Sequence, residues 1–132
     1  MKKIALAAAT LAAAAPAAVP ATAAAPTLGP HVWSTKITGS PVGLLNATWR
    51  LAFRNTAYNV TRNGGVVGAG TVKVVGSKIT FHDLAGTLAC RGAQAIGSYT
   101  WKIQGARLNF TRLSDACVGR RSVLSHAFTR IA

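Results

Sequence analysis

Two aspartates are the only acidic residues of this 132-residue chain, which contains no glutamate. Catalysis by a pair of carboxylates, as in glycoside hydrolysis, would have to use Asp83 with Asp115. A Ser-His-Asp triad would lack the Gly-x-Ser-x-Gly turn that commonly presents the nucleophile. His82 precedes Asp83, but neighbouring residues on a strand point to opposite faces, so the two could cooperate only if the strand had already ended there. We therefore predict that the protein is not an enzyme.

Cys90 and Cys117 are the only two cysteines. In a secreted protein such a pair most simply forms one disulfide. A zinc site would need nearby histidines at ligand spacing, whereas His31, His82 and His126 are scattered. A redox-active pair would need a Cys-x-x-Cys motif, which is absent. We predict a structural disulfide, with no metal and no cofactor.

Residues 1–25 have the features of a secretory signal peptide, with cleavage near 23–25. Lys2 and Lys3 precede an apolar run of about a dozen residues, shorter than the roughly 20 that a transmembrane helix needs. Small alanines and a threonine follow at 21–25. The sequence therefore predicts a secreted protein with no transmembrane segment, a flexible lead-in at 26–30 and one domain at 31–132. Loss of the two lysines would lower the net charge from +13 to +11.

Apolar and polar residues alternate through most of this domain. Trp49, Leu51 and Phe53 share one face of a segment, while Arg50 and Arg54 share the other. A period of two, interrupted by Asn-Gly and Gly-Ser turns, indicates half-buried antiparallel strands joined as hairpins. The pattern predicts no helix. The strands are expected at 31–38, 47–54, 56–62, 66–74, 77–82, 97–104, 107–113 and 122–130.

Eight short strands in sequence order predict an all-β fold, an up-and-down antiparallel eight-stranded barrel. A two-sheet β-sandwich is the alternative. The joins that contain Cys90 and Cys117 fall at the same end of such a barrel, so the two cysteines can meet. Their bridge would contribute about 3–4 kcal/mol to stability in the chain-entropy model.

Several motifs of the predicted strands and loops match a known group. They are GSYTW at 97–101, LNFT at 108–111, DACVGR at 115–120 and ATW at 47–49. With these motifs the chain resembles small secreted bacterial proteins that have a lipocalin-like (calycin-type) β-barrel. Calycins usually carry Gly-x-Trp on an early strand, and Ala47 stands here in the place of that glycine. The resemblance implies a barrel able to hold a small apolar ligand.

The resemblance also implies a role for an arginine near the last strand, which in calycins packs across the early tryptophan. Arg120 or Arg130 facing Trp49 would be the equivalent, with a solvated surface arginine as the alternative. Asp115 lies five residues before Arg120 in a loop that the predicted disulfide would hold. An ion pair, or an aspartate bound to loop N–H groups, explains both residues by structure alone.

The barrel interior is the candidate binding site. Eight-stranded barrels are just wide enough either to be filled by side chains or to hold one small ligand. A filled, purely structural barrel is the alternative to a cavity. The candidate cavity residues are Trp49, Phe53, Tyr58, Phe81, Tyr99, Trp101 and Phe110, and the polar candidates at the barrel mouth are Arg91, Asp115 and Arg120. We predict a non-enzymatic binding module for a small apolar ligand.

The thirteen lysines and arginines that follow the predicted signal peptide suggest a second kind of partner. They could attract anionic polymers or an anionic cell surface without specificity. The basic residues are spread along the strands, and no run is longer than Arg120-Arg121. Such spacing is typical of a solvated barrel exterior, so we predict no specific nucleic-acid partner.

Overall fold

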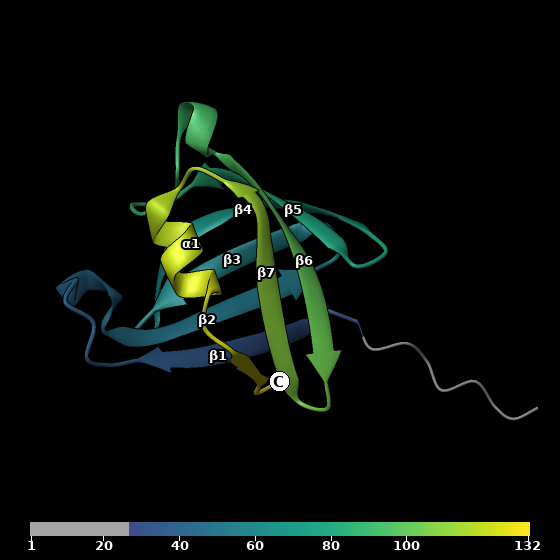
Figure 1. The fold of residues 1–132 in the computed structure, drawn as a ribbon, viewed down its shortest axis with the longest axis horizontal. Helices are drawn as coiled ribbons and strands as arrows, with labels where there is room; N and C mark the ends of the chain where they lie inside the picture. The colour runs from purple at the N-terminus through teal and green to yellow at the C-terminus, as the bar shows by residue number, and fades with distance from the viewer. Residues whose placement is uncertain (1–26) are drawn as a thin grey trace, which may run out of the picture.

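The protein is described by a computed structural model that covers residues 27–132, so the predicted signal peptide at 1–25 lies outside the described residues. Eight antiparallel strands follow one another in sequence order and close into a barrel (Figure 1). The predicted up-and-down barrel is confirmed, and the sandwich is not formed. The strands are β1 (His31–Ile37), β2 (Ala47–Arg54), β3 (Ala57–Arg62), β4 (Gly65–Val75), β5 (Lys78–Ala85), β6 (Ile96–Gln104), β7 (Arg107–Asp115) and β8 (Phe128–Arg130).

The connections divide the barrel into two unlike ends. One end, which we call the mouth end, carries the connections 38–46, 63–64, 86–95 and 116–127. Short 3-10 helices η1 (Gly43–Leu45) and η2 (Gly92–Gln94) lie in two of them. The opposite, closed end has only the two-residue turns 55–56, 76–77 and 105–106. At the mouth end, Asn63 and Gly64 both have positive φ, as the Asn-Gly turn requires.

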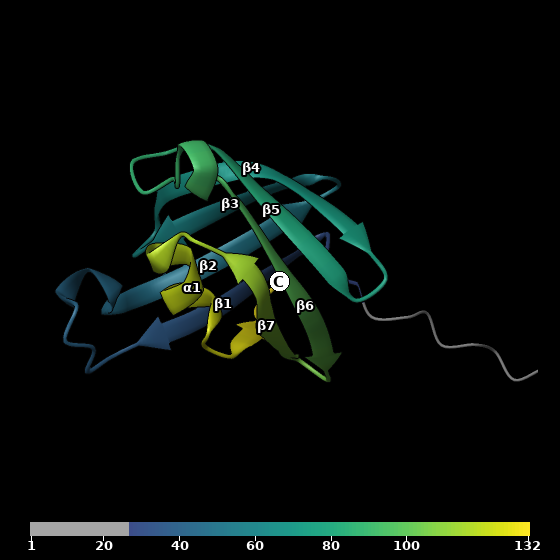
Figure 2. The same cartoon turned by 45° about the horizontal axis from the view of Figure 1, so that its top comes forward.

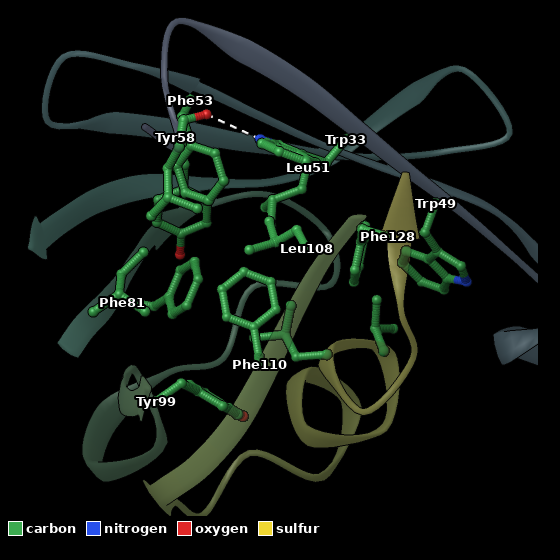
Figure 3. Packing of buried hydrophobic residues seen from close by; sticks show 14 of the residues in the cluster. Trp33, Trp49, Leu51, Phe53, Tyr58, Phe81, Tyr99, Leu108, Phe110 and Phe128 are labelled. Atoms are coloured by element: carbon green, nitrogen blue, oxygen red, sulfur yellow. Dashed lines mark hydrogen bonds between the residues drawn. The ribbon is translucent and has the colours of Figure 1, made fainter. Parts of the chain in front are cut away.

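Aromatic side chains from alternate strand positions pack inside the barrel (Figure 3). Phe81 lies at the centre of this packing. Its ring meets those of Tyr58, Tyr99 and Phe110 edge to face, with centroids 5.2, 5.9 and 5.9 Å away. Edge-to-face geometry places the positive edge of one ring against the negative face of another. The alternation in the sequence thus selects the side chains that fill the barrel.

At the closed end the chain preceding β1 contributes to this core. Leu28, which lies in the predicted lead-in, is buried. Its backbone oxygen accepts a 2.9 Å hydrogen bond from Nε1 of Trp33, the inward-facing tryptophan of β1. The indole N–H is thereby satisfied inside the barrel, as a buried polar group requires.

The predicted last strand at 122–130 is wrong over most of its length. Residues Val118–Leu124 form a helix, α1, and only Phe128–Arg130 form β8. The prediction followed the period-two spacing of Leu124, His126 and Phe128, but His126 is exposed between helix and strand. The helix forms because it buries Val123 and Leu124 against the barrel, and tertiary packing can stabilise a segment of weak intrinsic preference.

Helix α1 takes the place of a full-length eighth strand near the mouth. β8 pairs with β1 and β7 only through residues close to the closed end, such as Leu108 opposite Phe128. Above them α1 contacts β7 and η1, and it lies beside β7 in both views (Figures 1 and 2). The helix therefore covers part of the barrel opening.

The predicted disulfide is confirmed. Cys90, in the connection from β5 to β6, is joined to Cys117, the residue directly before α1. Their Cα atoms are 6.1 Å apart. The bridge ties two mouth connections together and fixes the start of the helix.

Candidate functional site

A buried polar cluster lies under the disulfide at the mouth end. Arg120, on α1, is at its centre, and we call the set of Tyr58, Asp83, Tyr99, Asp115 and Arg120 the Arg120 cluster. Nε of Arg120 donates to Oδ2 of Asp115 at 2.7 Å, and Nη2 donates to Oδ1 at 2.9 Å. This two-pronged contact matches the planar fork of guanidinium to a carboxylate.

Nη1 and Nη2 of Arg120 make further contacts. Nη1 donates to the Ala95 oxygen at 3.0 Å and lies 3.3 Å from Oδ1 of Asp83. Nη2 donates to the Gln94 oxygen at 2.9 Å. Four of the five N–H donors of the guanidinium therefore have a hydrogen-bond acceptor in the protein, and Nη1 also forms an ion pair with Asp83. The contacts of Arg120 are thus mostly made within the protein.

Asp115 is likewise bound within the protein. Its side chain is fully buried, and besides Arg120 it accepts from the Tyr99 hydroxyl and, at 2.9 Å, from the backbone N–H of Cys117. Asp83 accepts from the Tyr58 hydroxyl and, at 2.8 Å, from the backbone N–H of Cys90. Each half of the disulfide is thus held by one of the two acids.

Burial and hydrogen bonding set the ionisation of these groups. Burial works against the charged form of Asp115, but the hydrogen bonds from Arg120, Tyr99 and Cys117 outweigh it and hold the pKa of this carboxyl below its ordinary value. Burial, together with the adjacent carboxylates, raises the pKa of Tyr58 and of Tyr99 above their ordinary value. Both hydroxyls therefore stay protonated and act as donors.

Gly97 makes room for the cluster. A Cβ atom at this position would lie 2.6 Å from Oδ2 of Asp115 and 2.8 Å from Nη2 of Arg120. Only glycine allows the backbone of β6 to approach the ion pair this closely. The glycine belongs to the GSYTW motif, which therefore has a structural explanation.

The two acids do come together, as carboxylate catalysis would require, but they share one arginine. A general acid or base must be able to exchange a proton with a substrate. All acceptor positions of Asp115 face protein donors, and its charged form is stabilised by them. The cluster is suited to joining β3, β5, β6, β7 and α1, and it is poorly suited to proton transfer.

An apolar cavity of about 160 Å³ lies next to the cluster, between the barrel strands and α1. Barrel strands contribute Trp49, Leu51, Val60 and Gly68 to its lining. The mouth connections and α1 contribute Leu44, Leu45, Leu88, Cys90, Gly119, Arg120, Val123 and Leu124, and Phe128 of β8 completes it. Among residues 27–132, the charged residues that line it are Arg50 of β2, Asp83 of β5 and Arg120 of α1.

The predicted cavity residues occupy three different places. Trp49, Tyr58 and Phe81 line the cavity. Tyr99 and Phe110 lie in the filled part of the barrel, and Figure 3 shows both beside Phe81. Phe53 and Trp101 lie toward the closed end and line an open groove with Leu28.

The three residues predicted at the barrel mouth lie in two different environments. Asp115 and Arg120 belong to the buried cluster, whereas Arg91 is exposed in the connection from β5 to β6. Sequence reasoning missed the lining contributed by α1 and by the apolar loop residues Leu44 and Leu88. The Leu44-Leu45 pair inside a Gly-rich and Pro-containing connection was a signal that could have indicated them.

Arg62 packs against Trp49, in place of the expected Arg120 or Arg130. The guanidinium carbon of Arg62 lies 6.0 Å from the Trp49 ring centroid, a cation–π distance. Arg62 is the register partner of Trp49 on β3. Arg120 is engaged in its cluster, and Arg130 pairs with Trp33, the tryptophan of the first strand.

Within residues 27–132, no three or more His, Cys, Asp and Glu side chains are grouped so that they could hold a metal ion. No helix in this part of the chain is long and apolar enough to cross a membrane. Comparison with protein-family models, with curated proteins and with solved structures gave no match. The described residues form the eight-stranded closed barrel that the lipocalin-like resemblance implies, and the likeness is one of architecture.

Proposed function

We propose that the protein is a secreted, non-enzymatic member of the lipocalin-like barrels that binds a small, uncharged apolar molecule in the cavity beneath α1. The observation that carries the proposal is the cavity itself, which is lined mainly by aliphatic and aromatic side chains. The disulfide supports secretion, because such bridges persist in oxidising compartments outside the cytosol.

The volume limits the size of the ligand. An engineered apolar cavity of about 150 Å³ stays dry and accepts benzene or xenon. The 160 Å³ cavity is close to that size, so it can hold a single aromatic ring or a short aliphatic chain. Typical pockets for drug-sized molecules are larger, about 300–1,000 Å³.

The surrounding polar groups limit its chemistry. Arg120 makes four hydrogen bonds within the protein and is paired with both aspartates, which disfavours an anionic ligand. The Tyr58 hydroxyl donates to Asp83, which leaves its oxygen free only as an acceptor. A neutral ring, with at most one weak donor directed at Tyr58, is the ligand class that this lining favours.

Native mass spectrometry of the protein recovered from its own culture medium tests the proposal. We expect a retained mass below about 200 Da that disappears on unfolding, since the cavity holds only a small molecule. Protein that carries no such mass, and that also fails to bind added benzene or toluene, would show that the barrel is a purely structural one.

A further inference from the structure

Exposed apolar side chains gather at the mouth end of the barrel. Residues 27–132 expose eleven large hydrophobic side chains, and eight of them lie at this end. We call these eight the apolar collar: Val42, Leu44, Val66, Leu84, Leu88, Ile96, Leu113 and Val118. A soluble surface scatters such residues singly, whereas a gathered apolar surface indicates an interaction site.

The collar runs around the barrel and does not follow one strand. Every mouth connection contributes to it, either within the connection or from the strand residues that flank it. Val66 is the second residue of β4, and Ile96 is the first residue of β6. Val118 opens α1. Figures 1 and 2 show these connections and α1 at the same end of the molecule. A flat partner could therefore touch several members at once.

The charges around the collar are all positive. Asp83 and Asp115, the only acidic residues, are both bound to Arg120. The other twelve lysines and arginines of residues 27–132 consequently have no acidic side-chain partner. Arg91 and Arg112 are exposed at the mouth end, close in sequence to Leu88 and Leu113. The surface therefore combines apolar side chains with unpaired cations and lacks any free acid.

We propose that the mouth end docks on an anionic lipid bilayer, with the collar in the headgroup–acyl boundary and the arginines on the lipid phosphates. Interfacial binding draws on buried apolar area together with attraction to anionic lipid, and this surface offers both. A soluble polyanion would engage the arginines and leave the collar in water, so the bilayer is the partner that uses the whole surface. Leu44 and Leu88 belong to both the collar and the cavity lining, but the docking requires no ligand in the cavity.

Flotation of the purified protein with vesicles tests this docking. The vesicles contain either equimolar phosphatidylglycerol and phosphatidylcholine or phosphatidylcholine alone. The collar variants are Val66→Asp and Val118→Asp, whose side chains are each 62% exposed and do not line the cavity. The control is Val75→Asp, 64% exposed in β4 beside the closed-end turn 76–77. All three variants change the charge equally.

We expect wild-type protein to float with the anionic vesicles and each collar variant to bind about tenfold more weakly, the effect of withdrawing one valine side chain from the interface. The control should stay within about twofold of wild type, because its charge lies beyond the reach of the surface potential. Unchanged thermal unfolding and retained benzene binding would show that the variants keep the fold and the cavity.

Two outcomes would overturn the proposal. If the wild-type protein does not float with the anionic vesicles, it has no such docking surface. Equal weakening by Val66→Asp and Val75→Asp, with binding to soluble polyphosphate of similar strength, would assign the attraction to net charge and to anionic polymers. A failure of benzene binding alone would refute the cavity ligand and leave the docking intact.

Discussion

Replacing Arg120 by leucine should destabilise the protein more than any other single change to a charged residue. The substitution leaves Asp115, whose side chain is fully buried, and Asp83, whose side chain is 10% exposed, without a cation. Removing one partner of a buried ion pair costs about 3–5 kcal/mol, because the remaining charge is uncompensated. A domain of this size has a total stability of about 5–15 kcal/mol, so the loss is a large part of it.

The free energy of unfolding lost in Arg120→Leu should become smaller as the pH falls. In the wild-type protein the folded-state pKa of Asp115 lies below the unfolded value of about 3.9. The stabilisation from its charged form is therefore complete above that pH and is lost only as pH falls through the folded pKa. In Arg120→Leu, burial acts without its main opponent, so the pKa of Asp115 should rise above the unfolded value. Protonation then relieves the variant as the pH falls.

Denaturant unfolding at pH 7 and at pH 4.5 measures both effects. We expect a difference of about 3–5 kcal/mol between wild type and Arg120→Leu at pH 7, and a clearly smaller difference at pH 4.5. Arg121→Leu, the neighbouring residue on α1, is the matched control and should cost less than about 1 kcal/mol. A cost for Arg120→Leu at pH 7 no greater than that of the control would refute the structural role of the cluster.

Two further predictions concern the surroundings of the cluster. Replacing Cys90 and Cys117 together by serine should lower the free energy of unfolding by about 3–4 kcal/mol in the chain-entropy model. Denaturant unfolding of the variant and of the oxidised wild type measures this loss. An unchanged denaturation midpoint would contradict the prediction. Gly97→Ala should cost about 1–3 kcal/mol, because its Cβ collides with the ion pair of Asp115, whereas Gly43→Ala, whose Cβ meets no atom within 4 Å, should be near neutral in the same assay. Equal costs for the two alanine variants would disprove the close approach.

The barrel could be predicted because its signals are local. Alternation along each strand and the short turns between strands determine which side chains face inward and which strands pair. The disulfide agrees with the topology, because the connection from β5 to β6 and the connection from β7 to β8 lie at the same end of the barrel. The alternation also selected the aromatic core, with Phe81 and its neighbours at the centre.

Helix α1 could not be predicted from local pattern. The segment 118–124 contains a glycine and a valine among its first residues and is only seven residues long, too short to be helical alone in water. Its stability comes from the buried Val123 and Leu124, from the disulfide at its start and from Arg120 inside the cluster. These contacts join residues far apart in the sequence, so the period of the segment does not reveal them.

The same reason limited the prediction of the site. Asp115 and Arg120 were placed together from their spacing, but Tyr58, Asp83 and the carbonyl of Gln94 come from other strands and loops. The bonding of Arg120 within the protein is visible only once these partners are counted. It gives the two acids a structural role, because they anchor helix α1 beside the cavity.

Benzene binding to wild-type protein and to Gly68→Leu tests the central claim most directly. Gly68 lines the cavity, and a Cβ at this position meets only Val60 at ordinary contact distance, so we expect a leucine side chain to occupy cavity space. Gly65→Leu, on the exposed start of β4, is the control. Titration followed by NMR should give saturable binding with a Kd of about 1 mM or tighter for wild type and Gly65→Leu, and none for Gly68→Leu. Identical behaviour of all three proteins would contradict a ligand-binding cavity.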